Sequence, residues 1–260
     1  MSITFQDIEQ YRRDGYLLVD DVFAPEEVEA MLNEVHGGKR LSESELNTSD
    51  TQGNKVKLAY WEQLIGDIWS AASTDARIAL RVRLLLGEEA SFFHGKVMLK
   101  EARTGGAWEW HQDYGYWYNQ GFLYPGMISA FVALDAATVE NGCLRVLKGS
   151  HKLGRLDHGN VGGQTGADPA RMKELEGMYE TVHVTMSPGS VLFFDANLLH
   201  CSAANASDRH RRSFIMCYSA WSNPQLTRNG IVRRDACPIV DRATILPGAT
   251  ARQPEADVRQ

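Results

Sequence analysis

The sequence predicts an α+β chain with a mainly β core, a sandwich or barrel of short strands preceded by helices. Helical patterns are confined to about the first 90 of the 260 residues. Short apolar runs separated by Gly, Pro and Asn turns follow from residue 92 onward, and this order is typical of that class. We expect a single domain over 1–260, with a helical part to about residue 90, a core over about 91–222 and a C-terminal extension over about 223–260.

The first helix is expected over residues 4–14. Thr4 can cap its start, Asp7 lies in its first turn, and apolar side chains recur along one face at Phe5, Ile8 and Tyr11. A short strand is expected next, over residues 16–19.

A second helix is expected from Pro25 to about Val35, because Pro25-Glu26-Glu27 suits a first helical turn. Residues 37–55 are polar and rich in Gly and Ser, so they are expected to form a long loop. Residues 61–86 are expected to be mostly helical and to end at Gly87.

Six strands are expected in the second part of the chain, over residues 92–99, 127–134, 143–147, 179–184, 191–194 and 213–218. Residues 151–177 interrupt these strands and contain several glycines. We expect a long loop there that acts as a mobile lid over the site; the alternative is a solvated loop without that role.

Composition excludes several classes of function. The formal net charge of -6 argues against non-specific nucleic-acid binding, and no apolar run approaches the roughly 20 residues of a membrane span. The four cysteines form no CxxC pair and are expected to be free thiols in a reducing compartment. The charged N-terminus does not resemble a secretory signal. We expect a cytoplasmic monomer or homodimer that acts on a small molecule, with no nucleic acid or membrane as partner.

The segment Trp110-His111-Gln112-Asp113 and the distant His200 suggest a metal site. A His and an Asp two positions apart on a strand point to the same face, so both can bind one ion. His200 follows a long apolar run, where a buried polar ring needs a partner such as a metal. Two His and one carboxylate leave adjacent coordination positions open, as non-haem Fe(II) requires for a cosubstrate and O2.

Arg211 and Arg212 both follow His200 at a distance that allows either to bind a carboxylate. Strand alternation groups Arg211 with Ser213 and opposes it to Arg212, so one of the two arginines can face a metal. Ser202 can donate a second hydrogen bond to the same carboxylate. Taken alone, both arginines fit solvated charges at a sheet edge better than a carboxylate-binding role.

In combination these motifs resemble those of the phytanoyl-CoA dioxygenase family, over about residues 92–220. The matching segments are His111-Gln112-Asp113-Tyr114, Trp117, Asn141-Gly142-Cys143-Leu144-Arg145-Val146-Leu147-Lys148-Gly149-Ser150-His151, Pro188-Gly189-Ser190-Val191-Leu192-Phe193-Phe194-Asp195, His200 and Arg211. The resemblance implies a double-stranded β-helix, or jelly roll, with helices packed outside. It also implies an Fe(II)- and 2-oxoglutarate-dependent dioxygenase that consumes O2 and releases succinate and CO2.

The resemblance assigns roles to individual residues. It implies that His111, Asp113 and His200 hold Fe(II), and that Arg211 with Ser202 anchors 2-oxoglutarate. It implies that Trp117 and the inward face of the strand near 92–100 line the pocket; here that face carries His94, Lys96, Met98 and Lys100. His94 and Lys100 are therefore expected near the cosubstrate. Halogenases of this fold lack the metal carboxylate, so the presence of Asp113 implies hydroxylation.

The substrate is expected to be a small polar or zwitterionic metabolite, for example one that bears an ammonium or a phosphonate. Tyr114 and Tyr116, with neighbouring aromatic rings, can enclose an ammonium, and Lys96 or Arg103 can hold an anionic end; these aromatic rings are equally consistent with a core. An acyl-CoA substrate is the alternative within the family. Alternatives of other classes are a zinc hydrolase, which leaves Arg211 and Ser202 unexplained, and a jelly roll that binds a ligand without catalysis.

Overall fold

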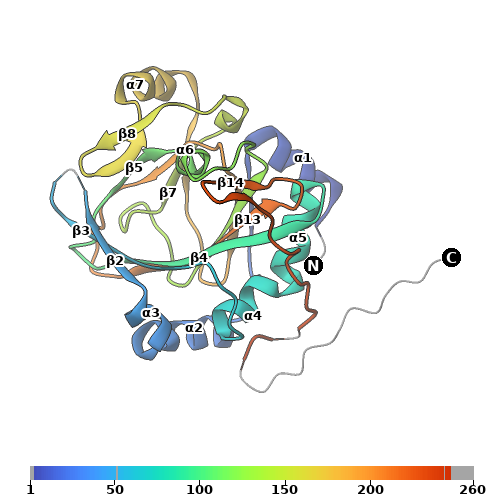
Figure 1. Ribbon diagram of the computed structural model, residues 1–260. Helices are drawn as coiled ribbons and strands as arrows, with labels where there is room; N and C mark the ends of the chain where they lie inside the picture. The colour runs from blue at the N-terminus through green and yellow to red at the C-terminus, as the bar shows by residue number, and fades with distance from the viewer. Residues whose placement is uncertain (1–2, 51, 243, 247–260) are drawn as a thin grey trace.

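The computed structural model describes residues 3–50, 52–242 and 244–246, and its centre is two facing β-sheets (Figure 1). The larger sheet has seven strands in the order β1-β11-β6-β13-β4-β3-β2, and the smaller has four in the order β10-β7-β12-β5. All pairings within both sheets are antiparallel. Except for β2 with β3, neighbouring strands are far apart in the sequence, as in a jelly roll.

The strands of the two sheets are short except for β4 and β13. The larger sheet comprises β1 (Tyr16–Val19), β2 (Glu45–Ser49), β3 (Lys55–Trp61), β4 (Ala90–Lys100), β6 (Met127–Ala133), β11 (Val191–Asp195) and β13 (Arg211–Ala220). The smaller comprises β5 (Trp108–His111), β7 (Leu144–Leu147), β10 (Thr181–Val184) and β12 (His200–Ser202). Two separate hairpins are formed by β8 (His158–Val161) with β9 (Gln164–Ala167), and by β14 (Gln225–Thr227) with β15 (Gly230–Val232).

Helices from the first part of the chain cover the outer face of the larger sheet (Figure 1). These helices are α1 (Phe5–Asp14), α2 (Pro25–Gly37), α3 (Lys39–Glu43), α4 (Ile68–Thr74) and α5 (Ala76–Leu86). Two further helices, α6 (Asp113–Asn119) and α7 (Pro169–Met178), and a short 3-10 turn, η1 (Ser150–Lys152), follow later in the chain. Thr4 caps α1 through a reciprocal bond with Asp7, and Gly87 ends α5 in the left-handed conformation.

Two apolar cores follow from strand alternation, because successive side chains of one strand point to opposite faces. On β13, Phe214 and Met216 pack outward against the helices, whereas Ile215 and Cys217 point into the space between the sheets. The outer core fixes the helices. The inner core surrounds the site.

Most of the expected elements are present, and two expectations are wrong. The segment expected as a loop over 37–55 contains α3 and the edge strand β2, which pairs with β3 through main-chain bonds that polar side chains do not prevent. Residues 151–177 are not an irregular loop either, since they contain η1, the β8–β9 hairpin and most of α7. Whether this structured segment moves as a lid stays a prediction.

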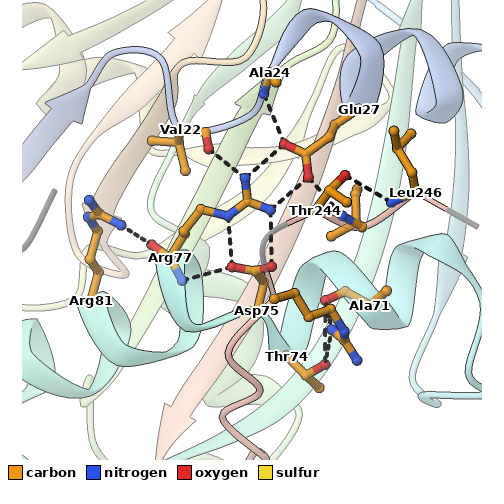
Figure 2. A network of polar contacts seen from close by, with 12 residues as sticks. Val22, Ala24, Glu27, Ala71, Thr74, Asp75, Arg77, Arg81, Thr244 and Leu246 are labelled. Atoms are coloured by element: carbon orange, nitrogen blue, oxygen red, sulfur yellow. Dashed lines mark hydrogen bonds and ion pairs between the residues drawn. The ribbon is translucent and has the colours of Figure 1, made fainter. Parts of the chain in front are cut away.

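A buried ionic network joins three distant parts of the chain (Figure 2). Arg77 at the start of α5 binds Glu27 of α2 at 2.8 Å, Asp75 at 2.8 Å and the carbonyl oxygen of Val22 at 3.0 Å. Glu27 also accepts a hydrogen bond from the backbone N–H of Ile245 at 2.7 Å. Both carboxylates are fully buried, so Arg77 compensates two charges that would otherwise lack a counterion.

The C-terminal part of the described chain lies against α2, α4 and α5. Val240 pairs with Asp75, and the backbone N–H of Cys237 bonds the carbonyl oxygen of Ala90 at 2.6 Å. All four cysteines are buried and free, as expected. Among the described residues no helix is both long and apolar enough to cross a membrane.

Replacing Arg77 tests how much this network stabilises the fold. Arg77→Met should lower the free energy of unfolding by about 3 kcal/mol, because it leaves two buried carboxylates unpaired. Arg83→Met removes the exposed pair with Glu89 and should cost less than about 1 kcal/mol. Urea denaturation measures both. Equal effects of the two substitutions would contradict this account.

Candidate metal centre

A cavity of about 220 Å³ lies between the inner faces of the two sheets. Its walls come from β3, β4, β6, β11 and β13 on one side, from β5, β7 and β12 on the other, and from α6 at one edge. The lining residues are Leu58, Tyr60, His94, Lys96, Met98, Trp108, His111, Asp113, Tyr116, Trp117, Gln120, Phe131, Leu144, Phe194, His200, Ser202, Arg211 and Ile215.

Three side chains meet in this cavity as a candidate metal site. His111 ends β5 and His200 begins β12, and the two residues are direct cross-strand partners. Asp113 joins them, and one ligand atom from each residue lies within 4.8 Å of the others. All three are at most 5% exposed.

The local geometry differs from the one expected for His111 and Asp113. The strand ends at His111, and Asp113 is the first residue of α6. Gln112 between them is extended (φ -106°, ψ 133°), so the backbone alternates as in a strand up to Asp113 and the two side chains point to the same side. Gln112 is fully buried; its side chain donates to the carbonyl oxygen of Asn197 at 3.0 Å and accepts from the N–H of Leu156 at 2.8 Å.

Both imidazoles are oriented by the main chain. Nδ1 of His111 lies 2.7 Å from the carbonyl oxygen of Glu109, and Nδ1 of His200 lies 2.9 Å from that of Leu198. A carbonyl oxygen only accepts, so each Nδ1 carries the proton and each Nε2 offers a lone pair. This arrangement around a metal ligand fixes the ring and its tautomer.

The protonation states also suit a cation. Burial lowers the pKa of His111 well below its ordinary value and lowers that of His200, so both rings are neutral. Burial alone would raise the pKa of Asp113, but Lys96, His200 and the hydroxyl of Ser129 together hold it below its ordinary value. Ser129 donates to Asp113 Oδ2 at 2.8 Å. The donor set is therefore two neutral nitrogens and one carboxylate.

Arg211 lies in the same cavity, on β13. It is 3% exposed and donates a long hydrogen bond to Ser213 Oγ at 3.4 Å, and its Nε has no partner among the described residues. Burial lowers the pKa of Arg211 to about 10. Arg212 points to the other face of the sheet and binds Asp135 at 2.7 Å. Of the two arginines, Arg211 is the one whose guanidinium has no acidic partner among the described residues.

Ser202 and Lys100 lie beside Arg211. Lys100 is directly opposite Arg211 on β4, and its Nζ donates to Ser202 Oγ at 3.0 Å and to the carbonyl oxygen of Ala203. Burial and the charge of Arg211 lower the pKa of Lys100 to about 6. Lys100 is not on the wall of the main cavity but behind Ser202. A Cβ at Gly142 would clash with the carbonyl oxygen of Ala203, the acceptor of Lys100, and would lie 3.2 Å from Lys100 Cδ, so a larger residue would not fit there.

The structure places His94, Lys96, Tyr116 and Trp117 on the cavity wall, as expected. The substrate-binding prediction is wrong for Tyr114, which is buried in the inner core with its ring 5.9 Å from that of Tyr118 and away from the cavity.

The substrate-binding prediction is also wrong for Arg103. It lies in an exposed turn after β4 and pairs with Asp208 at 2.6 Å. It does not line the cavity.

Two residues that support the metal ligands were not predicted from the sequence. Ser129, which holds Asp113, is a lone hydroxyl within the apolar strand Met127–Ala133, and that interruption was its only signal. His158 accepts a hydrogen bond from the backbone N–H of Gln112 at 2.9 Å. It belongs to the β8–β9 hairpin, whose packing against α6 no sequence pattern indicated.

A family model matches most of the chain. The model for phytanoyl-CoA dioxygenase (PhyH) covers residues 11–213, which include all three candidate ligands and Arg211. The chain belongs to the phytanoyl-CoA dioxygenase family. Several named relatives are similar to this chain over most of their length. The ectoine dioxygenase of Sphingopyxis alaskensis is 28% identical over 232 residues, covering 82% of this chain and 74% of that one.

Two further likenesses agree with this family. The L-proline trans-4-hydroxylase of Streptomyces griseoviridis is 25% identical over 259 residues, covering 89% of this chain and 93% of that one. The crystal structure of EctD from S. alaskensis with 2-oxoglutarate and 5-hydroxyectoine superimposes with a TM-score of 0.78 at 25% identity, covering 94% of this chain and 89% of that one. The expected jelly roll is confirmed, and so is the class of enzyme: an Fe(II)- and 2-oxoglutarate-dependent dioxygenase.

Metal binding can be tested without turnover. His111→Ala, Asp113→Ala and His200→Ala should each lose most bound Fe(II), because two remaining ligands bind a divalent ion weakly, while the fold survives. His183→Ala is a matched control, since His183 lies on β10 outside the cavity. Metal content after anaerobic loading and desalting measures the effect. Retention of near-stoichiometric iron by any of the three site variants would contradict the assignment.

Proposed function

We propose that this enzyme hydroxylates an unactivated C–H bond of a small zwitterionic metabolite, with conversion of 2-oxoglutarate and O2 to succinate and CO2. One observation carries the proposal: a buried set of two His and one carboxylate shares a small cavity with an arginine that has no acidic partner among the described residues. A metal site and an anion site in one cavity suit a cosubstrate that binds to both.

The proposed iron ligands are His111, Asp113 and His200. They fit Fe(II) because the two neutral rings present Nε2, the carboxylate is ionised, and three protein ligands leave positions open for other molecules. Bound iron supplies the activation of O2. The chain's own contribution is to hold these three groups rigidly through Glu109, Leu198 and Ser129 and to exclude bulk water from them.

The proposed cosubstrate anchor is Arg211 with Ser202. A guanidinium matches a carboxylate with two parallel hydrogen bonds, and the unpartnered Nε of Arg211 is one of the atoms that needs such an acceptor. Lys100 donates to Ser202 Oγ, which leaves the proton of that hydroxyl free to be donated to the same carboxylate. We propose that Lys100 positions Ser202, and that His94 and Trp117 form the adjoining walls.

The remaining space limits the substrate. A volume of about 220 Å³ is below the roughly 300–1,000 Å³ of typical drug-sized ligand pockets, and the cosubstrate must occupy part of it. A small polar metabolite fits this space better than the acyl chain of a CoA ester. The names of the relatives point the same way, since ectoine and L-proline are both small zwitterions.

The proposed function is tested by succinate release. Protein loaded with Fe(II) and 2-oxoglutarate is screened against ectoine, L-proline, other cyclic amino acids and an acyl-CoA. We expect one or more of the zwitterions to increase succinate formation and to gain a hydroxyl group detectable by mass spectrometry. Stimulation by the acyl-CoA alone would favour the alternative substrate class.

The two adjacent arginines provide a matched comparison. Arg211→Ala should raise the concentration of 2-oxoglutarate needed for half-maximal rate roughly 30-fold or more, because removing one partner of a buried charged pair costs about 2–5 kcal/mol. Arg212→Ala should change it little, since Arg212 binds Asp135 on the other face of the sheet. Similar effects of both substitutions would show that Arg211 is not the anchor.

A further inference from the structure

We propose that the primary substrate carries a carboxylate, and that Lys96 is the residue that binds it. This inference rests on the proposed function, and it narrows the substrate to amino-acid-like zwitterions whose anionic end is held beside the metal.

Lys96 lies at the centre of the cavity wall. It is on β4 between His94 and Met98, which line the same cavity, and its neighbours across the sheet are Tyr60 on β3 and Ile215 on β13, also on the wall. The side chain of Lys96 is 21% exposed. Arg211, by contrast, is 3% exposed. A substrate arriving after the cosubstrate therefore has access to Lys96.

Lys96 has no dedicated partner in the described part of the chain. Its Nζ makes one ion pair there, with Asp113 Oδ1 at the limiting distance of 4.0 Å, and donates no hydrogen bond to a described residue. The buried Lys100, by contrast, donates to Ser202 Oγ and to the carbonyl oxygen of Ala203. When Asp113 binds a metal ion, its charge is shared with that ion, and Lys96 loses most of its compensation.

A count of charges supports a missing anion. The lining contains two permanent cations, Lys96 and Arg211, and a single carboxylate, Asp113. Iron adds two positive charges and 2-oxoglutarate adds two negative ones. The loaded cavity then has one positive charge in excess, and an uncompensated buried charge is costly. A substrate carboxylate beside Lys96 would pair with this charge, whereas a purely cationic substrate would add a second one. In a zwitterion the accompanying positive group must then be held elsewhere on the wall.

The rest of the wall suits the other end of such a molecule. No acidic side chain other than Asp113 lines the cavity, so a substrate ammonium would find no free carboxylate there. Six aromatic rings are available instead, those of Tyr60, Trp108, Tyr116, Trp117, Phe131 and Phe194, and aromatic faces bind ammonium groups. The expected orientation places the carboxylate at Lys96 and the cationic or apolar body against these rings.

Matched acid and amide pairs test the proposal. L-Proline with L-prolinamide, ectoine with its carboxamide, and further amino acids with their amides are titrated anaerobically into enzyme loaded with Fe(II) and 2-oxoglutarate, and the change in the metal-to-cosubstrate charge-transfer absorption reports binding. The acids that bind are then assayed for KM and kcat. The variants are Lys96→Met, Lys96→Arg and, as a lysine outside the cavity, Lys148→Met.

We expect at least one acid to bind and be turned over, and its amide to bind roughly 30-fold or more weaker, as expected for loss of a buried charged pair. Lys96→Met should weaken the acid by a similar factor, mainly through KM, and should abolish the difference between acid and amide. Lys96→Arg should retain the preference for the acid. Lys148→Met should behave as the wild type.

Three results would overturn the proposal: a best substrate without an anionic group, no acid that binds, or an unchanged acid preference in Lys96→Met. Weaker binding of 2-oxoglutarate in Lys96→Met, with the acid preference intact, would assign Lys96 to the cosubstrate instead. Succinate formation without added substrate separates this inference from the proposed function, because that activity requires iron and 2-oxoglutarate but no occupant at Lys96.

Discussion

The site depends on the antiparallel pairing of β5 with β12. This pairing makes His111 and His200 direct neighbours, with ring centroids 4.1 Å apart. Each ring is then held by the carbonyl oxygen two residues before it, at Glu109 and Leu198. Packing alone does not account for two buried neutral rings this close, since the Nε2 of each ring carries no proton and needs a partner. A metal ion resolves that arrangement.

The two sheets contribute different residues to the cavity. The histidines come from the smaller sheet, whereas Lys96, Arg211 and the supporting Ser129 come from the larger one, and Asp113 lies on the helix between them. The two histidines and Ser202 therefore lie on one wall of the cavity, and Lys96 and Arg211 lie on the other. A cosubstrate that contacts both walls would hold the two sheets together, so its binding should be coupled to the stability of the inner core.

Much of the fold could be predicted because strands and helix caps leave local patterns. The apolar runs after residue 90 became β4, β6, β7, β10, β11 and β13 with small changes in their bounds. The edge strand β2 could not be predicted in this way, because its pairing with β3 uses main-chain groups that every residue has. The alternation that separates Arg211 from Arg212 was visible in the sequence because both lie within one regular strand.

The errors near the metal have one geometric cause. Asp113 was assigned to a strand but begins a helix, and side chains that share a helix face recur three and four residues apart. Tyr116 and Trp117 therefore face the cavity with Asp113, whereas the adjacent Tyr114 turns into the core. Once the helix is known, Gln120 follows as the next residue on that face, and it does line the cavity. The segment that contains Asp113 lies between two groups of aromatic residues, and its residue pattern did not distinguish a helix from a strand.

The most direct test of the central claim is the fate of O2. Enzyme, Fe(II) and 2-oxoglutarate are incubated under isotopically labelled O2 with the best substrate of the screen, and succinate and product are analysed by mass spectrometry. The account predicts one labelled oxygen atom in each succinate molecule, formed in step with O2 consumption, and loss of the signal in Arg211→Ala at low 2-oxoglutarate. Absence of succinate, or succinate without label, would contradict the assignment of this cavity to a 2-oxoglutarate-dependent dioxygenase.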